Sequence, residues 1–303
     1  MQINKVAFIG KGGVGLLYGS MIAQALGNDA VEYVMDDARF ERHAGDALTV
    51  NGKLCALKSV RASEATPVDL VILTVKTTGL DQALKTMERI VGPDTLIASL
   101  CNGITSEQKI AERFGWEHTV LGICQAWTLC FSTARSPLPM RARSALVRPP
   151  APTPRPSPLS TGSTRAAASP IPSSTTSHIA CGPNSCSTTA STRPVWPTAA
   201  PTEALRSRLR AAPQFCLRHA RDACSRQCEG IELTEEDLTQ MVRLIKGLDP
   251  AGMPSMAQDR IAQRRTEVEE FAGTICRLAA KHGIQVPQNE WLYSRIREIE
   301  ASW

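Results

Sequence analysis

The sequence predicts an α/β domain with a parallel sheet, followed by an all-helical domain, with a segment of aberrant composition between them. Three observations lead to this fold class. An apolar strand near the N-terminus enters a glycine-rich turn, further apolar runs alternate with helical patterns, and helix start and stop signals dominate the C-terminal part. We therefore predict domains at 1–131 and 229–303, with the aberrant segment at 132–228.

The first element is a short strand at Val6–Ile9 that runs into glycines with the spacing G-x-G-x-x-G. Gly10 allows a tight turn, Gly12 leaves room for a pyrophosphate, and Gly15 lets the next helix pack closely. The free N–H groups of that helix would bind the phosphates. Glycine-rich turns also serve packing alone, so this alternative stays open. The candidate cofactor-binding stretch is Gly10-Lys11-Gly12-Gly13-Val14-Gly15.

A second strand, Val31–Met35, ends in Asp36, about twenty residues after the glycines. A carboxylate there can accept both ribose hydroxyls of NAD(H) and would repel a 2′-phosphate. Asp36 therefore favours NAD(H). Two alternatives remain open: Asp36 serves as a helix cap or turn residue, or Arg39 and Arg42 offer a phosphate site.

Polar residues follow two later strands. Val68 to Val75 is almost continuously apolar, as expected of a central strand covered on both faces, and Lys76 follows it. A helix at about Leu80–Val91 leads to a strand at Thr95–Leu100, with Asn102 at its tip. Ligands bind at the carboxyl ends of such strands, so Lys76 and Asn102 are candidate site residues. Each taken alone is equally compatible with a solvated strand end or a turn.

Bulk composition excludes several classes of protein. A chain of 303 residues with 43% hydrophobic content has room for two globular domains. It has no apolar run long enough for a membrane span and no signal peptide at the start, so we expect a cytoplasmic protein. Ten scattered cysteines form no disulfide framework or regular zinc pattern. The positive net charge of +5 comes from the aberrant segment, which carries +11 while the rest of the chain carries −6, so we expect no nucleic-acid partner for the globular parts.

The segment 132–228 holds fifteen of the twenty prolines, thirteen arginines, no lysine and two acids. It shows no sustained periodicity, and its composition is typical of a disordered linker. A stretch this long without structure is unusual inside a compact enzyme.

We advance the hypothesis that residues 126–228 are read out of frame. In a displaced frame, the codons of Ala126–Cys130 permit Met-Asp-Ala-Val followed by Phe or Leu, and those of Cys181–Ser187 permit a run beginning Trp-Thr-Lys. The excess of Ala, Arg, Pro, Ser and Thr is what a GC-rich gene yields out of frame. A genuine disordered insert is the alternative. Sequencing the gene across codons 120 to 235 distinguishes the two.

Helical signals return after residue 229. A helix is expected from Thr234 to about Lys246 and a last amphipathic helix from Asn289 to Ile299. Between them, Ser255 and Gln258 form a capping box that predicts one long helix to about Lys281.

Glu267 is the candidate site residue of this long helix. It shares one helical face with Phe271, Ile275 and Leu278. A carboxylate in line with an apolar stripe is costly unless it is paired. The alternative is a salt bridge from Glu267 to Arg264 or another neighbour.

Together these pieces resemble the ketopantoate reductase (2-dehydropantoate 2-reductase) family, over about 1–125 and 229–303. The family fold is a Rossmann domain followed by an all-helical domain, with the active site between them. The residues that carry the resemblance are Gly10-Lys-Gly-Gly-Val-Gly15, Val75-Lys76, Asn102-Gly103, Pro254-Ser-Met-Ala-Gln-Asp259, Arg265-Thr-Glu267 and Lys281-His-Gly-Ile-Gln-Val-Pro287.

The resemblance implies transfer of a hydride from a reduced nicotinamide to the carbonyl of a small 2-oxo acid, giving the 2-hydroxy acid. Asn102 would orient the nicotinamide and substrate, Ser255 and Glu267 would bind the substrate, and Lys76 would lie near the cofactor. The family usually prefers NADP(H) and reads its 2′-phosphate with an arginine after the second strand, whereas this chain has Asp36 there.

The family's general acid, a lysine in a Trp-x-Lys setting, has no counterpart, since no lysine lies between Lys109 and Lys246. The displaced frame supplies one in that setting. Two other functions stay open: a catalytically inactive nucleotide-binding protein, and another Rossmann-plus-helical dehydrogenase acting on a hydroxyacyl or sugar-phosphate substrate. The sequence leaves the oligomeric state open, with a homodimer as one option.

Overall fold

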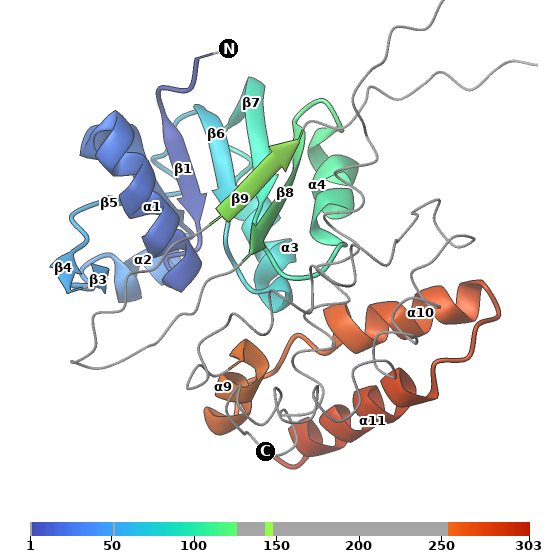
Figure 1. Ribbon diagram of the computed structural model, residues 1–303. Coiled ribbons are helices and arrows are strands. Elements are labelled where there is room, and N and C mark those ends of the chain that lie inside the picture. The colour runs from blue at the N-terminus through green and yellow to red at the C-terminus, as the bar shows by residue number, and fades with distance from the viewer. Residues whose placement is uncertain (1, 51, 126–142, 148–253) are drawn as a thin grey trace, which may run out of the picture.

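The computed structural model describes residues 2–50, 52–125, 143–147 and 254–303, and everything below concerns these residues (Figure 1). The sheet has seven strands in the order β5-β2-β1-β6-β7-β8-β9, all parallel to their neighbours except β9. These strands are β1 (Val6–Ile9), β2 (Val31–Met35), β5 (Lys58–Arg61), β6 (Val68–Leu73), β7 (Val91–Ser99), β8 (Thr119–Gln125) and β9 (Arg143–Val147).

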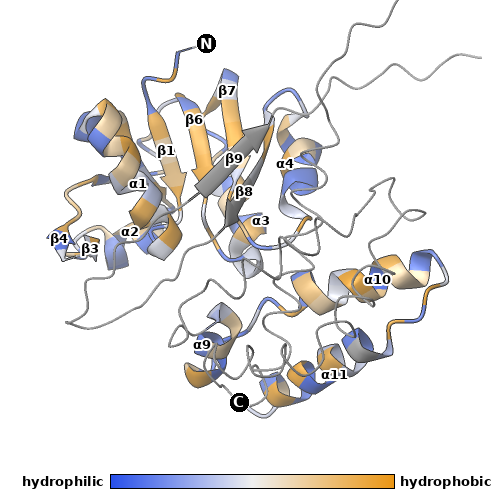
Figure 2. Cartoon of the chain, in the orientation of Figure 1, coloured by the Kyte–Doolittle hydropathy of each residue, from blue (hydrophilic) through white to orange (hydrophobic). Residues whose placement is uncertain are grey.

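Helices cover both faces of the sheet because side chains alternate along each strand. Val6 and Phe8 of β1 pack with α1 in one buried cluster, while Ala7 and Ile9 pack with α3 and α4 in another. Figure 2 shows the central strands β1, β6 and β7 as almost wholly hydrophobic and the helices as mixed. The helices of this domain are α1 (Gly13–Leu26), α2 (Asp37–His43), α3 (Leu80–Thr86) and α4 (Ser106–Phe114), with short 3-10 turns at Asn28–Ala30 and Thr77–Gly79 and a small hairpin of β3 (Thr49–Val50) and β4 (Lys53–Leu54).

The described C-terminal part is helical and lies against the carboxyl ends of the parallel strands (Figure 1). Met256, Phe271, Leu292 and Ile296 belong to its buried core. Its elements are α9 (Ser255–Ile261), a π-helical turn (Glu269–Gly273), α10 (Thr274–Lys281) and α11 (Pro287–Ala301). The predicted α/β domain followed by a helical domain is therefore confirmed.

The prediction of one helix from Ser255 to Lys281 is wrong. The chain leaves the helix after α9, with Gln263 at a φ of 47°, and becomes helical again only at the π turn. The capping box is also absent: Pro254 is the N-cap, its carbonyl accepts from the amides of Ala257 and Gln258, and the cap has no side-chain hydrogen bond. Tertiary hydrogen bonds to the residues between α9 and the π turn replace the helical ones that periodicity alone predicts.

Two further boundaries differ from the sequence analysis. The helix α3 ends at Thr86, and Val91 already begins β7. Within the aberrant segment, Arg143–Val147 forms β9, which pairs antiparallel with β8, so these five residues depart from the expectation of a segment without regular structure. The rest of that segment, its cysteines and the predicted helix at 234–246 lie outside the described residues.

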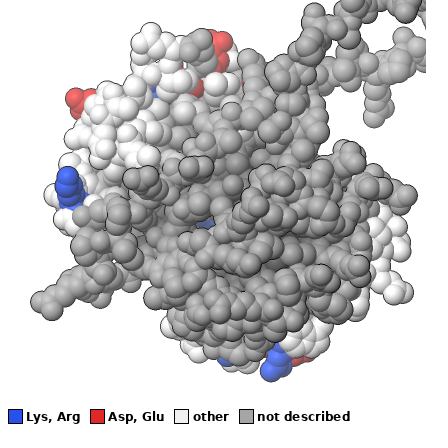
Figure 3. Space-filling model, viewed as in Figure 1, with Lys and Arg blue, Asp and Glu red and all other residues white. Residues whose placement is uncertain are grey.

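Among the described residues, no helix is both long and apolar enough to cross a membrane. On the face shown in Figure 3, the described charged side chains appear as separate basic and acidic groups rather than as a continuous basic patch.

Candidate functional site

The site begins at the glycine turn between β1 and α1. Gly10 has a φ of +117°, and a Cβ on it would lie 2.8 Å from the backbone of Thr74. A Cβ on Gly15 would lie 2.1 Å from the carbonyl oxygen of Gly10, so the helix can approach the strand this closely only with glycine. A Cβ on Gly12 would meet nothing within 4 Å. The open side of the turn is therefore at Gly12, where a pyrophosphate would approach.

This turn lies at the topological switch point of the sheet. β2 and β6 flank β1 on opposite sides, and the Thr74 hydroxyl after β6 donates to the Gly10 carbonyl at 2.8 Å. Ligands of open α/β sheets bind in this position. The helix α1 begins at Gly13 and Val14, and its N-cap, Gly12, makes no side-chain capping hydrogen bond. Lys11 turns instead toward the end of α2 and β5, with its Nζ 3.3 Å from the His43 carbonyl oxygen and 3.3 Å from the Ser59 hydroxyl.

Asp36 is the N-cap of α2. Its Oδ1 accepts from the Arg39 amide at 2.9 Å, and its Oδ2 lies 3.4 Å from the Arg39 Nε. The structure therefore confirms the alternative that Asp36 serves as a helix cap. Arg39 also extends toward the turn after β6, because a Cβ on Gly79 would lie 3.7 Å from its Nη2. A carboxylate and a guanidinium thus flank the place where the second ribose of a dinucleotide would lie, and ribose binding by Asp36 stays a prediction.

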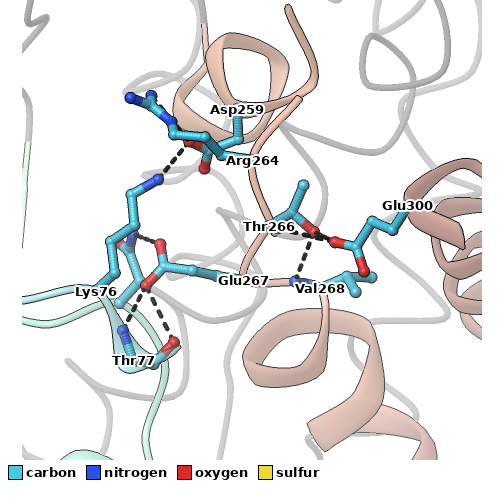
Figure 4. Close-up of polar contacts among 9 residues, drawn as sticks. Lys76, Thr77, Asp259, Arg264, Thr266, Glu267, Val268 and Glu300 are labelled. Atoms are coloured by element: carbon cyan, nitrogen blue, oxygen red, sulfur yellow. Dashed lines mark hydrogen bonds and ion pairs between the residues drawn. The ribbon is translucent and has the colours of Figure 1, made fainter. Parts of the chain in front are cut away.

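Glu267 lies between the tips of two strands and is only 3% exposed. Its Oε1 accepts from the Thr77 amide at 3.0 Å and from the Thr77 hydroxyl at 3.1 Å, and its Oε2 accepts from the Asn102 side-chain amide at 2.7 Å. The carboxylate thereby joins the helical domain to the carboxyl ends of β6 and β7 (Figure 4). Arg264, the partner that the sequence left as an alternative, pairs with Asp259 instead.

Lys76 pairs across the two domains with Asp259 of α9, which is only 1% exposed (Figure 4). Arg264 contacts the same oxygen of Asp259 from the other side, with its Nη2 at 3.1 Å. Ser255 is exposed and begins α9, four residues before Asp259. The contacts of Lys76 with Asp259 and of Asn102 with Glu267 bring Lys76, Asn102 and Glu267 to one edge of the sheet, whereas the part of Ser255 in the site stays a prediction.

The loop that carries Asn102 is fixed by a second contact between the domains. Gly103 has a φ of +93°, and a Cβ on it would lie 3.0 Å from the Glu270 carboxylate. The Thr105 hydroxyl donates to the same carboxylate at 2.5 Å. The turn that Asn102-Gly103 predicts is therefore real, and it also orients the amide toward Glu267.

Cys101 lies next to Asn102 but is no candidate nucleophile. Burial raises the pKa of its thiol to about 12, so the thiol stays protonated at neutral pH.

Sequence reasoning missed Thr77, Asp259 and Glu270 as residues of this site. Thr77 and Asp259 meet partners that are more than 180 residues away in the chain. No local pattern indicates such a pairing, and only the position of Asp259 in the motif after Ser255 hinted at it.

The fold and the site define a Rossmann-type α/β protein whose helical second domain contacts the carboxyl edge of its sheet. Two family models match the chain: "Ketopantoate reductase PanE/ApbA" over residues 6–131 and "Ketopantoate reductase PanE/ApbA C terminal" over residues 203–300. The chain belongs to the ketopantoate reductase family.

Similar proteins of known name agree with this family. The 2-dehydropantoate 2-reductase of Vibrio cholerae is 35% identical over 77 residues, which are 25% of this chain and 26% of that protein. The Salmonella typhimurium protein of the same name is 28% identical over 100 residues, 30% of this chain and 33% of that protein. The chain thus aligns with only about a quarter to a third of the length of these relatives.

Solved structures share the fold across nearly the whole chain. A D-mandelate dehydrogenase with NADH and anilino(oxo)acetate has a TM-score of 0.74 at 21% identity, covering 98% of both chains. A dimeric ketopantoate reductase from Staphylococcus aureus has a TM-score of 0.68 at 18% identity, covering 98% of this chain and 99% of that chain.

Proposed function

We propose that this chain binds a reduced nicotinamide dinucleotide. We further propose that its site is built for the reduction of a small, ketopantoate-like 2-oxo acid to the 2-hydroxy acid. The observation that carries the proposal is the Glu267 carboxylate, held by Thr77 and Asn102 beside the glycine turn. A dinucleotide on that turn would extend along the carboxyl edge of the sheet toward these residues.

The residues present fit such a cofactor. Gly12 leaves the turn open, and the first amides of α1, where no side chain caps the helix, would bind the pyrophosphate. When bound, the nicotinamide supplies the hydride that adds to the substrate carbonyl carbon. Asn102 would orient the reacting groups through its amide, Glu267 would hold the hydroxyl that forms, and Ser255 would bind the substrate carboxylate or hydroxyl. Lys76 would place its ammonium near the cofactor.

The carbonyl oxygen must also receive a proton, and the printed chain offers no lysine for this between Lys109 and Lys246. Loss of a general acid typically lowers the rate about 10²–10⁴-fold. We therefore propose that the printed chain binds the nucleotide with little turnover, and that a chain with 126–228 read in the displaced frame is an active reductase.

NADH is the proposed cofactor for this chain, although the family resemblance implies NADPH. Asp36 stands where a 2′-phosphate would lie, and a solved structure of the same fold is described with NADH. Arg39 is the feature that would favour NADPH if its pair with Asp36 opened. Fluorescence titration of both nucleotides against the full chain gives the preference directly.

The test of the proposed reaction compares the printed chain with the frame-corrected chain. We expect both to bind NADH and only the corrected chain to oxidise it in the presence of ketopantoate, with a loss of turnover in Glu267→Ala. A corrected chain that binds NADH but reduces no 2-oxo acid would overturn the reaction. Absence of nucleotide binding in both would overturn the site itself.

A homodimer belongs to the proposal, because the structural relative from Staphylococcus aureus is described as dimeric. Sedimentation equilibrium of the full chain measures this directly.

A further inference from the structure

Glu300, near the end of α11, has a buried carboxylate with hydrogen-bond partners on another segment, which distinguishes it from an ordinary surface acid. It is only 6% exposed. Its Oε1 accepts from the Thr266 amide at 2.8 Å and from the Thr266 hydroxyl at 2.6 Å, while its Oε2 lies 3.1 Å from the Arg297 Nη1. The Oε1 of Glu300 therefore accepts two hydrogen bonds from Thr266, and its Oε2 pairs with the guanidinium of Arg297 on the same helix.

These bonds reach both neighbours of Glu267. The Thr266 hydroxyl that donates to Glu300 also accepts from the Val268 amide at 3.3 Å. Val268 is 2% exposed and packs in the helical core. The main chain on either side of Glu267 is thus tied to α11, while the Glu267 side chain extends the opposite way, toward Thr77 (Figure 4).

The stretch between α9 and the π turn needs these hydrogen bonds to Glu300 because it is not helical. Between α9 and the π turn, Thr266 has no helical carbonyl for its amide, and Thr266 itself is 5% exposed. A buried N–H without a partner is costly, and a charged acceptor binds it more strongly than a neutral one. Glu300 supplies that acceptor from α11, which packs against the π turn that follows Glu267.

We propose that Glu300 is a positioning residue for Glu267, acting through Thr266. It sets where the Glu267 carboxylate meets Thr77 and Asn102, and it thereby fixes the geometry of the substrate site. This inference rests on the proposed function for its catalytic consequence, but the positioning itself is measurable without catalysis.

The amide of Thr77 reports the position of Glu267, because it donates to the Glu267 carboxylate. Hydrogen exchange followed by mass spectrometry on the full chain, without ligand, reads this amide and that of Thr266 separately. In Glu300→Ala we expect both amides to exchange faster, by about tenfold. In Glu267→Ala we expect faster exchange at Thr77 with Thr266 still protected.

The matched control is Glu298→Ala. Glu298 lies on the same helix, is exposed, and its Oε2 lies 2.9 Å from the Nη1 of Arg295. We expect wild-type exchange at both amides. Faster exchange at Thr266 together with unchanged exchange at Thr77 in Glu300→Ala would overturn the proposal, because Glu300 would then stabilise its own contact without placing Glu267.

Two more conservative substitutions, both at Thr266, test the proposal if Glu300→Ala does not fold. Thr266→Val removes the hydroxyl and keeps the side-chain volume and the amide, whereas Thr266→Ser keeps the hydroxyl. We expect Thr266→Val to raise exchange at Thr77 and Thr266→Ser to leave it at the wild-type rate. Equal rates in the two variants would contradict the proposal.

Kinetics separate this inference from the proposed function. In the frame-corrected chain, Glu300→Ala should lower kcat/KM for the 2-oxo acid on the order of 10–100-fold, with Kd for NADH unchanged. If no 2-oxo acid is reduced by any variant and the exchange at Thr77 still follows Glu300, the proposed reaction fails and the positioning role stands. If reduction occurs and Glu300→Ala leaves kcat/KM unchanged, the positioning role fails.

Discussion

At the scale of single residues, the glycines of the first turn divide into two kinds. Gly10 and Gly15 are required by the fold, because a side chain on either would meet backbone within 3 Å. Gly12 is not required by the fold, because its Cβ position is open. Close approach of a ligand would explain a glycine at this helix N-terminus, and the binding of a pyrophosphate there is a prediction.

This division predicts opposite outcomes for two alanine substitutions. Gly15→Ala should destabilise the free protein by about 1–3 kcal/mol, since its Cβ overlaps the Gly10 carbonyl. Gly12→Ala should leave the melting temperature unchanged and weaken NADH binding, since the new methyl group occupies the place of the pyrophosphate. Thermal unfolding and NADH titration of both variants check this. Full NADH affinity in Gly12→Ala would refute the phosphate site.

Asp36 combines a structural and an electrostatic role, and two variants separate them. Asp36→Asn keeps an oxygen that can cap α2 and removes the charge that pairs with Arg39. We expect unchanged stability and a ratio of NADPH to NADH affinity that rises on the order of fivefold or more. Asp36→Ala should raise the same ratio and also lose about 1 kcal/mol of stability through the lost cap. An unchanged ratio in both would show that Asp36 does not set the cofactor preference.

At the scale of elements, the break between α9 and the π turn is the decisive feature of the helical domain. A continuous helix would satisfy Thr266 internally and keep Glu267 on an apolar stripe. Because the helix is broken, the Thr266 amide donates to Glu300 instead, and the Glu267 carboxylate accepts from Thr77. π turns are frequent at functional sites, and here one directly follows the candidate site residue.

The helix α4 contains a buried acid whose titration should be visible in stability. Burial raises the pKa of Glu107, a shift that the hydrogen bond from Ser106 partly opposes. A raised folded-state pKa means that the native state binds the proton more tightly than the unfolded state. Stability is therefore highest below the unfolded-state pKa and falls as pH rises through the folded-state value.

Glu107→Gln removes this titration. Its urea midpoint relative to wild type should rise more at pH 8 than at pH 4, because the cost of a buried charge is lost only where wild type is ionised. Glu112→Gln, which replaces an exposed acid of the same helix, is the matched control for the loss of one carboxylate from α4. A uniform effect of Glu107→Gln at both pH values would contradict the assignment.

At the scale of the whole molecule, polar contacts join the two domains across the carboxyl edge of the sheet. Glu267 binds Thr77 and Asn102, and Asp259 pairs with Lys76. Hydrogen bonds and ion pairs weaken quickly with distance, so these contacts depend on how the two domains are placed.

A double-mutant cycle measures one of these contacts. Lys76→Met and Asp259→Asn each remove one partner of the cross-domain pair. We expect a coupling free energy of about 1 kcal/mol in urea unfolding, since Lys76 is 42% exposed and solvent screens the pair even though Asp259 is buried. The same cycle between Lys109→Met and Asp81→Asn, an exposed pair within the sheet domain, should give a smaller value. A coupling of zero for Lys76 and Asp259 would remove this pair from the contacts that hold the domains together.

The local sequence determined those parts of the protein that depend on backbone conformation and periodicity. The glycine spacing after Val6–Ile9 predicts the turn, and the apolar runs at Val31–Met35 and Val68–Leu73 predict buried parallel strands, because each pattern reflects the conformation of its own residues. Their positions after apolar strands singled out Lys76 and Asn102, and its place on an apolar stripe singled out Glu267. The structure brings these three residues to one edge of the sheet.

Only the tertiary structure decided how those residues are held. Three pairings join residues that are far apart in the chain. Lys76 and Asp259 are 183 residues apart, Thr77 and Glu267 are 190 apart, and Thr266 and Glu300 are 34 apart. The periodicity of 255–281 predicted an unbroken helix because local pattern contains no information about a distant acceptor for the Thr266 amide. A buried amide takes the strongest partner that packing brings within reach, and that partner is known only once the chain has folded.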